Sequence, residues 1–333
     1  MEYAIRRSQG AGQGSRDLVV HLRVLHTDRI GLSTMLRKLL RSAKRTELGW
    51  RYGSNLRPTL RFLFDGRKPA GRDAEILKDL NMHGVAVVPF ESLDTEVNFS
   101  DLERAVNNLV EGEMPAILDI KESARTDHSI GRKTFNLEMF GSEVTFDPNS
   151  IFSRLALSKS FLTIADCYFR MQTRLRYYNV WYTSASTSAA RESQLWHFDR
   201  EDRLILKIFV YLSDVDHGAG PFTYAPGTHK KGRFSSMSPA FFDEDGVRRT
   251  TDEQMSNSYP QENWRVCTGK KGTVILADTR GFHKGGEART SDRLMFICMF
   301  TSPASESRKL LRYPDDVTFS DLERGQRAAL GYE

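Results

Sequence analysis

Short apolar runs dominate the chain from residue 175 onward, separated by turns rich in Gly, Pro, Asp and Ser. Runs of this length and spacing are typical of strands in a β-sandwich or a jelly-roll barrel. In the run 203–212 every even position is aliphatic, whereas Lys207, Phe209 and Tyr211 share the opposite face. The pattern predicts strands at about 175–183, 194–199, 203–212, 221–225, 264–268, 272–278 and 293–301.

Before residue 175 the apolar positions recur mainly at helical spacing. We expect a helix at 75–83 that ends at Gly84, a residue suited to a left-handed C-cap. A strand at 85–90 and a helix at 101–110 with Ser100 as N-cap follow. Helical spacing returns over 152–171, where we expect packing on the core. Together the two halves predict an α+β protein with a mainly β core.

The first 72 residues have a different composition. Residues 29–72 are strongly basic, and Leu32, Leu36 and Leu39 belong to an apolar stripe that predicts an amphipathic helix at about 32–46. This helix either lays its stripe on the main domain or contacts an anionic membrane surface or acidic partner. The neighbouring aromatic residues follow no base-stacking pattern, so we do not expect nucleic-acid binding.

These differences suggest a division of the chain into three parts. We expect a basic N-terminal extension, partly helical, at 1–72, a main domain at 73–303 and a C-terminal tail at 304–333. The polar segment at about 232–262 reads as an insertion in the main domain, and long insertions often cover active sites.

Bulk composition excludes several classes of protein. The chain is 39% hydrophobic and 27% charged, which is normal for a soluble globular protein. No apolar run approaches the roughly 20 residues that a transmembrane helix needs, and the first residues lack the apolar core of a secretory signal. Three separated cysteines form neither a disulfide framework nor a paired-thiol metal site. We therefore expect a cytoplasmic protein.

Two histidines and an aspartate carry the candidate chemistry. On a strand, His197 and Asp199 point to one face while Phe198 points to the other. His283 follows the apolar run 272–278 and can approach from another strand. Two imidazoles and a carboxylate that leave open coordination positions suit Fe(II) oxygenase chemistry.

A His-x-Asp triplet alone is a weak signal, because a second copy occurs at His26-Thr27-Asp28 in the basic N-terminal region. Arg293 strengthens the case for the other copy, since it is the charged residue that begins an otherwise apolar strand. A guanidinium in an apolar pocket can bind a carboxylate with two parallel hydrogen bonds. The alternative is an Arg at the strand edge, paired with Asp292 or Glu287.

Several motifs between about Glu75 and Ser302 resemble the phytanoyl-CoA dioxygenase family of Fe(II)/2-oxoglutarate oxygenases. Gln194-Leu-Trp-His-Phe-Asp199 resembles the strand that carries the family's metal motif. The stretch 211–216 and Gly220-Pro-Phe-Thr-Tyr-Ala-Pro-Gly-Thr-His-Lys230 resemble the family's Gly-Pro turn and Pro-Gly-Ser/Thr-His motif. The resemblance implies a double-stranded β-helix, a jelly-roll or cupin-like barrel, with helices packed on one side.

The resemblance also implies roles for individual residues. His197, Asp199 and His283 would be the iron ligands and the catalytic centre, Arg293 would bind the distal carboxylate of 2-oxoglutarate, and His229 would be structural. The implied cofactors are Fe(II), 2-oxoglutarate and O₂, with ascorbate as the reductant in vitro. Related halogenases have a small residue in place of the metal-binding carboxylate, so Asp199 favours hydroxylation.

The expected reaction is hydroxylation of an unactivated C–H bond in a small metabolite or lipid-like molecule, with release of succinate and CO₂. Two alternatives stay open: the same chemistry on a nucleic acid or protein recruited by the basic segment, and a non-catalytic module that binds a membrane or partner. A succinate-release assay and the iron content separate these cases.

Three polar strand residues each have two alternative roles. Gln194 and Asn179 lie on strands near the expected metal and either bind the nearer carboxylate of 2-oxoglutarate or are ordinary polar strand residues. Lys207 either meets an acidic group of the substrate or faces solvent.

Overall fold

The computed structural model describes residues 46–126, 134–237, 249–306 and 310–332. The chain divides into two compact units, Met1–Ser54 and Asn55–Glu333. The described part of the first unit forms a π-helix at Gly49–Ser54. The helix expected at about 32–46 lies outside the described residues except for its last position, and so does the triplet at 26–28.

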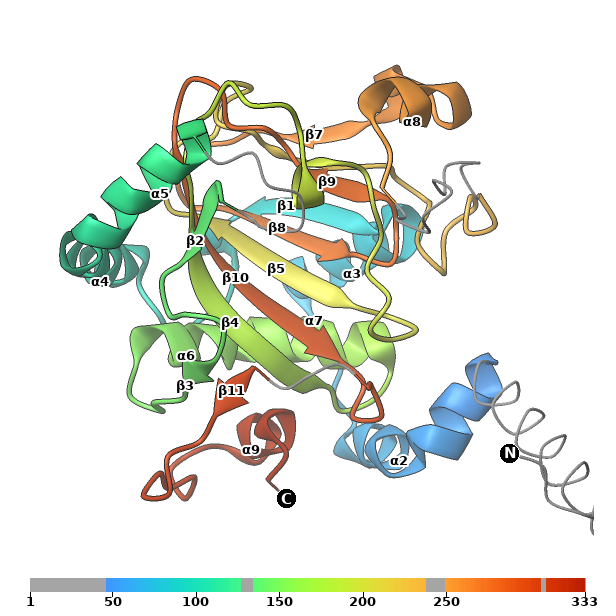
Figure 1. Cartoon of the computed structure of the whole chain (residues 1–333). Coiled ribbons are helices and arrows are strands. Elements are labelled where there is room, and N and C mark those ends of the chain that lie inside the picture. Colours follow the sequence, from blue (N-terminus) through green and yellow to red (C-terminus); the bar gives the residue numbers. More distant parts are fainter. Residues whose placement is uncertain (1–45, 127–133, 238–248, 307–309, 333) are drawn as a thin grey trace, which may run out of the picture. The chain divides into compact units, whose positions relative to one another are not determined.

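A six-stranded antiparallel sheet is the centre of the second unit (Figure 1). Its order is β1-β8-β5-β10-β4-β2. The strands are β1 (Val85–Pro89), β2 (Asn136–Glu138), β4 (Arg174–Thr183), β5 (Leu206–Tyr211), β8 (Thr273–Asp278) and β10 (Arg293–Thr301). The four central strands are the apolar runs in which periodicity predicted strands, and β1 confirms the strand expected after Gly84.

A smaller antiparallel sheet has the order β7-β6-β9. It consists of β6 (Phe222–Tyr224), β7 (Arg265–Cys267) and β9 (His283–Gly285). A separate parallel pair joins β3 (Val144–Thr145) to β11 (Leu311–Arg312).

The regular strand predicted at 194–199 is wrong. This segment begins as a 3₁₀ turn at Glu192–Gln194 and then pairs only through isolated bridges. The reason is that its backbone groups have three separate partners: Trp196 pairs with Thr250, His197 with His283, and Asp199 donates to Thr279. No continuous ladder can form with three partners.

The helices of the second unit are α2 (Leu56–Asp65), α3 (Gly71–His83), α4 (Phe99–Gly112), α5 (Met114–Thr126), α6 (Ile151–Ala156), α7 (Lys159–Phe169), α8 (Asp252–Ser258) and α9 (Arg324–Leu330). The single helix expected over 152–171 is two helices, because Ser158 has an extended backbone and begins α7 as its N-cap. Asn98, not Ser100, is the N-cap of α4. Helix α8 falls in the segment expected to be an insertion.

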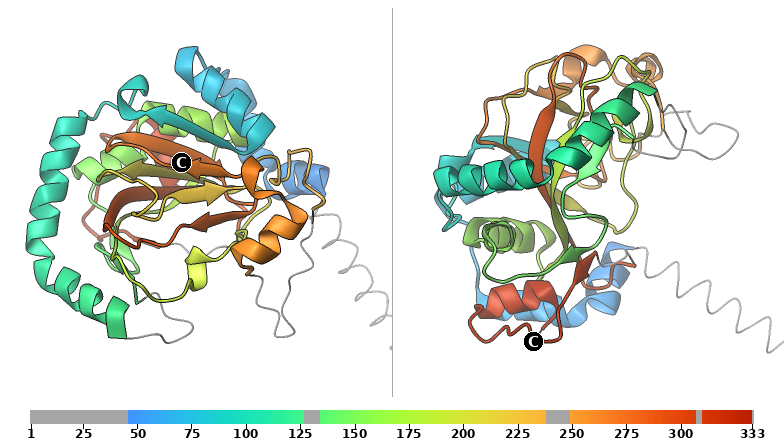
Figure 2. Two further views of the ribbon diagram at one scale, coloured as in Figure 1. Left: turned by 90° about the horizontal axis from the view of Figure 1, so that it is seen from above. Right: turned by 60° about the vertical axis from the view of Figure 1, so that its left-hand side comes forward.

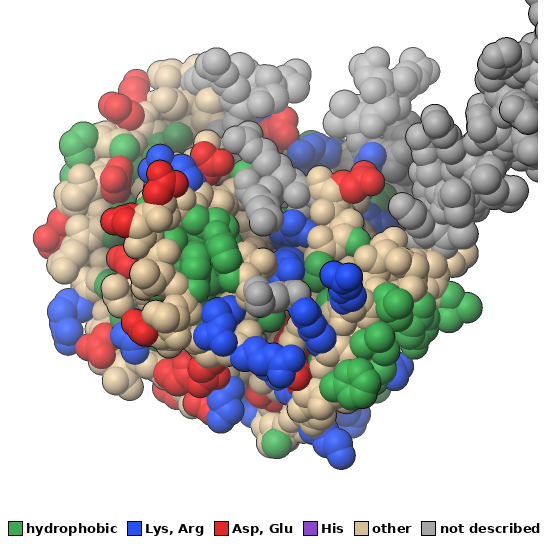
Figure 3. All heavy atoms as spheres, turned by 90° about the horizontal axis from the view of Figure 1, so that it is seen from below, with side chains coloured by type: hydrophobic (Ala, Val, Ile, Leu, Met, Phe, Trp, Pro, Cys, Tyr) green, Lys and Arg blue, Asp and Glu red, His purple; other side chains and the backbone are tan. Residues whose placement is uncertain are grey.

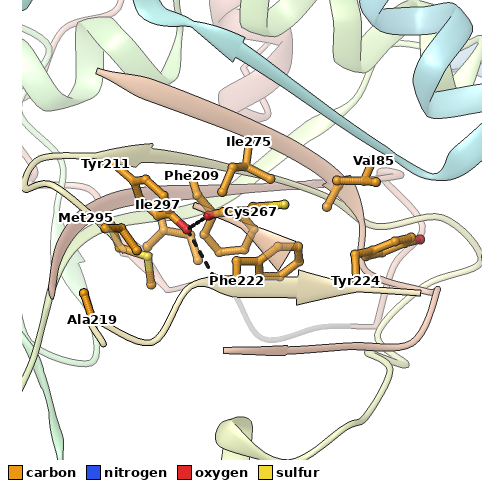
Figure 4. Packing of buried hydrophobic residues seen from close by; sticks show 12 residues of the cluster. Val85, Phe209, Tyr211, Ala219, Phe222, Tyr224, Cys267, Ile275, Met295 and Ile297 are labelled. Atoms are coloured by element: carbon orange, nitrogen blue, oxygen red, sulfur yellow. Dashed lines mark hydrogen bonds between the residues drawn. The ribbon is translucent and has the colours of Figure 1, made fainter. Parts of the chain in front are cut away.

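The large sheet separates helices from the small sheet (Figures 1 and 2). Helices α3, α6 and α7 pack against one face; for example, Phe152 of α6 stacks on Phe296 of β10. Alternate residues of the same strands, such as Phe209 and Ile297, point the other way and pack with Phe222 of the small sheet (Figure 4). The two sheets therefore enclose a common apolar core.

Tyr211 links the two sheets by hydrogen bonds as well as by packing. Its hydroxyl donates to the carbonyl of Cys267 (2.7 Å) and accepts from the backbone N–H of Phe222 (3.2 Å), as the dashed lines of Figure 4 show. Among the described residues, no helix is long and apolar enough to cross a membrane.

Candidate metal centre

Backbone pairing brings the two histidines together. His197 and His283 exchange both N–H···O=C hydrogen bonds, each 2.9 Å long, and their ring centroids lie 4.3 Å apart. Two residues after His197, the backbone N–H of Asp199 donates to the carbonyl of Thr279 (2.8 Å) and so fixes the position of Asp199. One potential ligand atom from each of His197, Asp199 and His283 lies within 4.8 Å of the others. The structure thus assembles the three residues that the sequence singled out.

The imidazoles are held in a form that can bind a metal. Nδ1 of His197 lies 2.8 Å from the carbonyl of Leu195, and Nδ1 of His283 lies 3.0 Å from that of Gly281. A neutral ring that donates from Nδ1 presents the lone pair of Nε2 to the cavity. Burial lowers the pKa of His197 to about 3 and also lowers that of His283, so both rings are neutral at neutral pH.

Gly281 is required by the approach of another side chain. A Cβ at this position would collide with the hydroxyl of Tyr224, which donates to the carbonyl of Asp278 (2.7 Å). The Gly-Phe-His sequence therefore places a carbonyl under His283 where a larger residue would not fit.

Asp199 has a cationic partner inside the cavity. Nζ of Lys207 lies 2.7 Å from Oδ2 of Asp199, and the two side chains are only 13% and 11% exposed. Burial alone would raise the pKa of Asp199, but the Lys207 ammonium, joined in strong acid by the protonated imidazoles, outweighs it and holds the pKa below its usual range. Burial would likewise lower the pKa of Lys207, but Asp199 raises it. Lys207 therefore does not face solvent.

Arg293 is buried with unsatisfied donors. Its Nη2 lies 3.4 Å from Oγ1 of Thr183, while Nε and Nη1 have no hydrogen-bond partner within the described ranges. Asp292 instead pairs with Lys121 (2.8 Å), and Glu287 pairs with Arg289. The two acidic partners that would make Arg293 an ordinary edge residue are thus engaged elsewhere.

One cavity of about 300 Å³ holds all these groups. Its wall includes the histidine–aspartate group, Lys207 and Arg293. The rest of the wall is mixed: Tyr177, Trp181, Phe209, Phe222, Met295 and Ile297 are apolar or aromatic, whereas Glu138, Glu201 and Arg249 are charged. A cavity with aromatic and aliphatic walls and convergent polar groups is typical of a small-molecule site.

Two other predicted residues are occupied by backbone contacts. The side-chain oxygen of Asn179 accepts from the N–H groups of Phe140 and Val180, and its nitrogen donates to Gly141 (2.9 Å). Gln194 accepts from the N–H of Arg191 (3.1 Å) and does not line the cavity. Their contact with 2-oxoglutarate stays a prediction; Asn179 lines the cavity, and its side-chain NH₂ group has a second N–H beside the one donated to Gly141.

Neighbouring residues divide between the cavity and the packing around it. Trp196 points away from the cavity, and its indole N–H donates to Asp252 (2.8 Å). His229 is fully buried, lies outside the histidine–aspartate group and approaches the carbonyl of Asn81 (3.3 Å).

Sequence reasoning missed some lining residues. The two-residue period of the strand that carries Asn179 puts Tyr177 and Trp181 on the same face as Asn179, so the sequence held a signal for them. Arg249, which pairs with Glu192 (3.0 Å), carries no motif of its own.

The donor set fits a divalent metal with a dicarboxylate beside it. Two neutral imidazoles and one carboxylate converge at one end of the cavity, a combination typical of non-haem iron sites. The buried guanidinium of Arg293 lacks partners for two of its nitrogens and is suited to a carboxylate.

Comparison with known proteins agrees with this chemistry. A family model described as "Phytanoyl-CoA dioxygenase (PhyH)" matches residues 123–295. No curated protein matches the sequence.

Three solved structures are among those that resemble this chain. The epimerase SnoN from nogalamycin biosynthesis, in complex with Fe³⁺, alpha-ketoglutarate and nogalamycin RO, is 15% identical over 72% of this chain and 86% of that chain, with a TM-score of 0.47. AviO1 from Streptomyces viridochromogenes Tue57 is 16% identical over 72% and 100%, with a TM-score of 0.45. EctD from S. alaskensis with bound Fe is 17% identical over 80% and 88%, with a TM-score of 0.44. These superpositions are too weak to assign a reaction to this chain.

The family match is more informative, because it covers just over half of the chain. It contains the complete histidine–aspartate group and Arg293. The chain therefore belongs to the phytanoyl-CoA dioxygenase (PhyH) family of iron- and 2-oxoglutarate-dependent oxygenases.

Proposed function

We propose that this protein is an Fe(II)- and 2-oxoglutarate-dependent hydroxylase that acts on a small metabolite or lipid-like substrate and releases succinate and CO₂. The observation that carries the proposal is the buried guanidinium of Arg293, which shares one cavity with the two-histidine, one-carboxylate group. Burying charged donors without partners is costly, so a site that does so is suited to an anionic ligand.

His197, Asp199 and His283 would hold the iron through two Nε2 atoms and the carboxylate. When bound, iron and 2-oxoglutarate supply the activation of O₂ and the oxidation that the side chains cannot perform. The part of the chain's own residues is to fix the ligands: Leu195 and Gly281 orient the two rings through Nδ1.

Arg293 would bind the distal carboxylate of 2-oxoglutarate. It begins β10 directly opposite Thr183, which ends β4, and the Thr183 hydroxyl lies against the guanidinium. Because both residues stand at strand ends on a hydrogen-bonded sheet, the clamp is rigid and keeps its N–H groups directed into the cavity.

The substrate class follows from the size and lining of the cavity. A volume of about 300 Å³ with aromatic and aliphatic walls suits a small, partly apolar molecule. The presence of Asp199 supports hydroxylation, because the halogenases related to this family lack that carboxylate.

We also propose that the two facing sheets form the double-stranded β-helix that the family resemblance implies. One wall would be β4, β10, β5 and β8, and the other would be the segment 194–199 with β9, β6 and β7. The boundaries expected for this domain, 73–303, stay a prediction and fall within the compact unit 55–333.

Replacing Asp199 by Ala should abolish catalysis by removing one ligand. We expect iron content after anaerobic reconstitution to fall to background and substrate-dependent succinate formation to fall more than about 100-fold, since even outer contacts to metal ligands contribute 10- to 100-fold. Asp214→Ala, at a carboxylate that pairs with Lys270 on the surface, is the matched control. Full turnover by the Asp199 variant would contradict the ligand assignment.

Replacing Arg293 by Leu should affect the co-substrate and spare the metal. Losing a charge-assisted contact of about 3 kcal/mol should raise the KM for 2-oxoglutarate about 100-fold, while iron content stays unchanged. Arg293→Lys should recover part of the loss, because an ammonium keeps the charge but not the paired geometry. An unchanged KM in the Leu variant would refute the clamp.

Lys207 should contribute most to the stability of the metal-free protein. Lys207→Met leaves the buried carboxylate of Asp199 without its ion-pair partner, at a cost of about 3–5 kcal/mol in the metal-free protein. A divalent ion restores a positive partner, so Fe(II) should stabilise the variant more than the wild type in anaerobic urea unfolding. Lys121→Met, which breaks the more exposed pair with Asp292, should show the wild-type response to metal. Equal stabilisation of all three proteins by Fe(II) would exclude a role for Lys207 in compensating Asp199.

The metal-free protein should lose stability in mild acid. His197 has a pKa of about 3 when folded and about 6.5 when unfolded, so below pH 6.5 the unfolded chain takes up a proton that the folded chain does not. The free energy of unfolding should therefore fall by up to about 1.4 kcal/mol per pH unit from this ring, and the lowered pKa of His283 acts in the same direction. Urea unfolding of the wild type and of His197→Gln at several pH values isolates the contribution of this ring. If the free energy of unfolding has the same pH dependence in both proteins, the prediction is wrong.

A further inference from the structure

Helix α2 is held to the protein by its polar side. The carbonyl of Pro58 accepts from the backbone N–H of Gln172 (3.1 Å), and the carboxylate of Asp65 accepts from the side-chain amide of Gln172 (2.8 Å). Thr59 is the buried side chain of this helix, and Asn55 just before it accepts from the N–H of Ala304 (3.0 Å).

Next to this attached side, α2 carries an exposed apolar stripe. Leu56, Leu60, Leu63 and Phe64 are 44%, 40%, 55% and 85% exposed. Their spacing of four, seven and eight residues from the first puts them on one face of the helix. We call these four residues the α2 stripe. A surface helix normally buries its apolar stripe and exposes its polar side, so this inverted arrangement indicates a surface that meets a partner.

Positive charge is concentrated around this helix in the sequence. Residues 32–68 contain ten Lys and Arg but only Glu47 and Asp65 as acids, a net charge of +8. The whole chain carries +5, so the remaining residues are net negative. Arg57 and Lys68 are exposed near the two ends of the α2 stripe. Figure 3 shows hydrophobic side chains gathered at the right of one face, beside Lys and Arg side chains.

We propose that the α2 stripe and the basic residues beside it dock on the surface of an anionic lipid bilayer. A helix with Leu and Phe on one face and Arg or Lys next to it binds at the headgroup boundary, where the apolar side chains insert and the cations meet lipid phosphates. This inference is independent of the proposed reaction.

Charge and side-chain type argue against other occupants. Three of the four stripe residues are aliphatic and offer no ring for stacking on bases, so nucleic acid fits the stripe poorly. A second copy would bring the same positive segment against itself. Residues 1–45 also carry ten basic against three acidic residues, so covering α2 with them would oppose like charges.

Flotation of the full-length protein with vesicles tests the proposal. We expect binding to phosphatidylcholine vesicles that contain phosphatidylserine and little binding to phosphatidylcholine alone. Leu63→Ser with Phe64→Ser should weaken binding at least about tenfold by removing inserted apolar surface. Arg57→Gln with Lys68→Gln should weaken it about fivefold for each charge removed, and added salt should have a similar effect.

A matched control comes from α5, which also exposes apolar residues. Met114 and Leu118 are 41% and 59% exposed, and Met114→Ser with Leu118→Ser should leave vesicle binding unchanged. Equal loss in this control, or equal binding to neutral vesicles, would overturn the proposal.

Other occupants of the α2 stripe have their own signatures. A dimer that dissociates in the Leu63 and Phe64 variant would identify a second copy. A lower free energy of unfolding in that variant would identify coverage by the chain itself. Tight binding to single-stranded DNA that needs Arg57 and Lys68 but not the α2 stripe would identify nucleic acid. Each of these results, without vesicle binding, overturns the lipid assignment.

Discussion

The reciprocal backbone hydrogen bonds between His197 and His283 are the constraint on which the site depends. They join a segment without regular strand structure to β9, and so place two imidazoles face to face although 85 residues separate them in the sequence. The absence of a Cβ at Gly281 leaves room for the Tyr224 hydroxyl beneath this junction. Tyr211 then ties the small sheet to the large one, which carries Lys207 and Arg293. Two short elements and one tyrosine therefore help to set the distances from the histidine–aspartate group to Lys207 and Arg293.

The electrostatics of the cavity follow from this geometry. Burial keeps both imidazoles neutral, so the charge within the histidine–aspartate group is the carboxylate of Asp199, which Lys207 faces. Arg293 also lines the cavity, as do Glu138, Glu201 and Arg249. An Fe(II) ion together with doubly ionised 2-oxoglutarate adds no net charge to this set. The site can therefore take both without accumulating unpaired charge in a medium of low dielectric constant. In the metal-free protein Lys207 already compensates Asp199, and only the guanidinium stays without an anion.

Local sequence patterns predicted much of the fold because they depend on neighbours along the chain. Short apolar runs bounded by turn residues identified the central strands of the large sheet, and Gly84 correctly marked the end of α3. The secondary-structure predictions fail where hydrogen bonds to residues distant in the sequence determine the backbone conformation. The segment at 194–199 has three different pairing partners, and the expected helix at 152–171 breaks where Ser158 becomes an N-cap. Neither event leaves a clear trace in apolar periodicity, since both depend on backbone hydrogen bonds.

The sequence by itself determined which residues are candidates for the chemistry. The order of His197, Asp199, His283 and Arg293 among apolar strands is a property of the chain, and a strand's two-residue period fixes which side chains share a face. Only the tertiary structure decided what those side chains contact. It paired Lys207 with Asp199, engaged the amide of Asn179 with the backbone at 140–141, and turned the apolar side of α2 outward. These outcomes depend on residues brought together from distant parts of the chain, and the balance of burial and charge at such contacts exists only once the chain has folded.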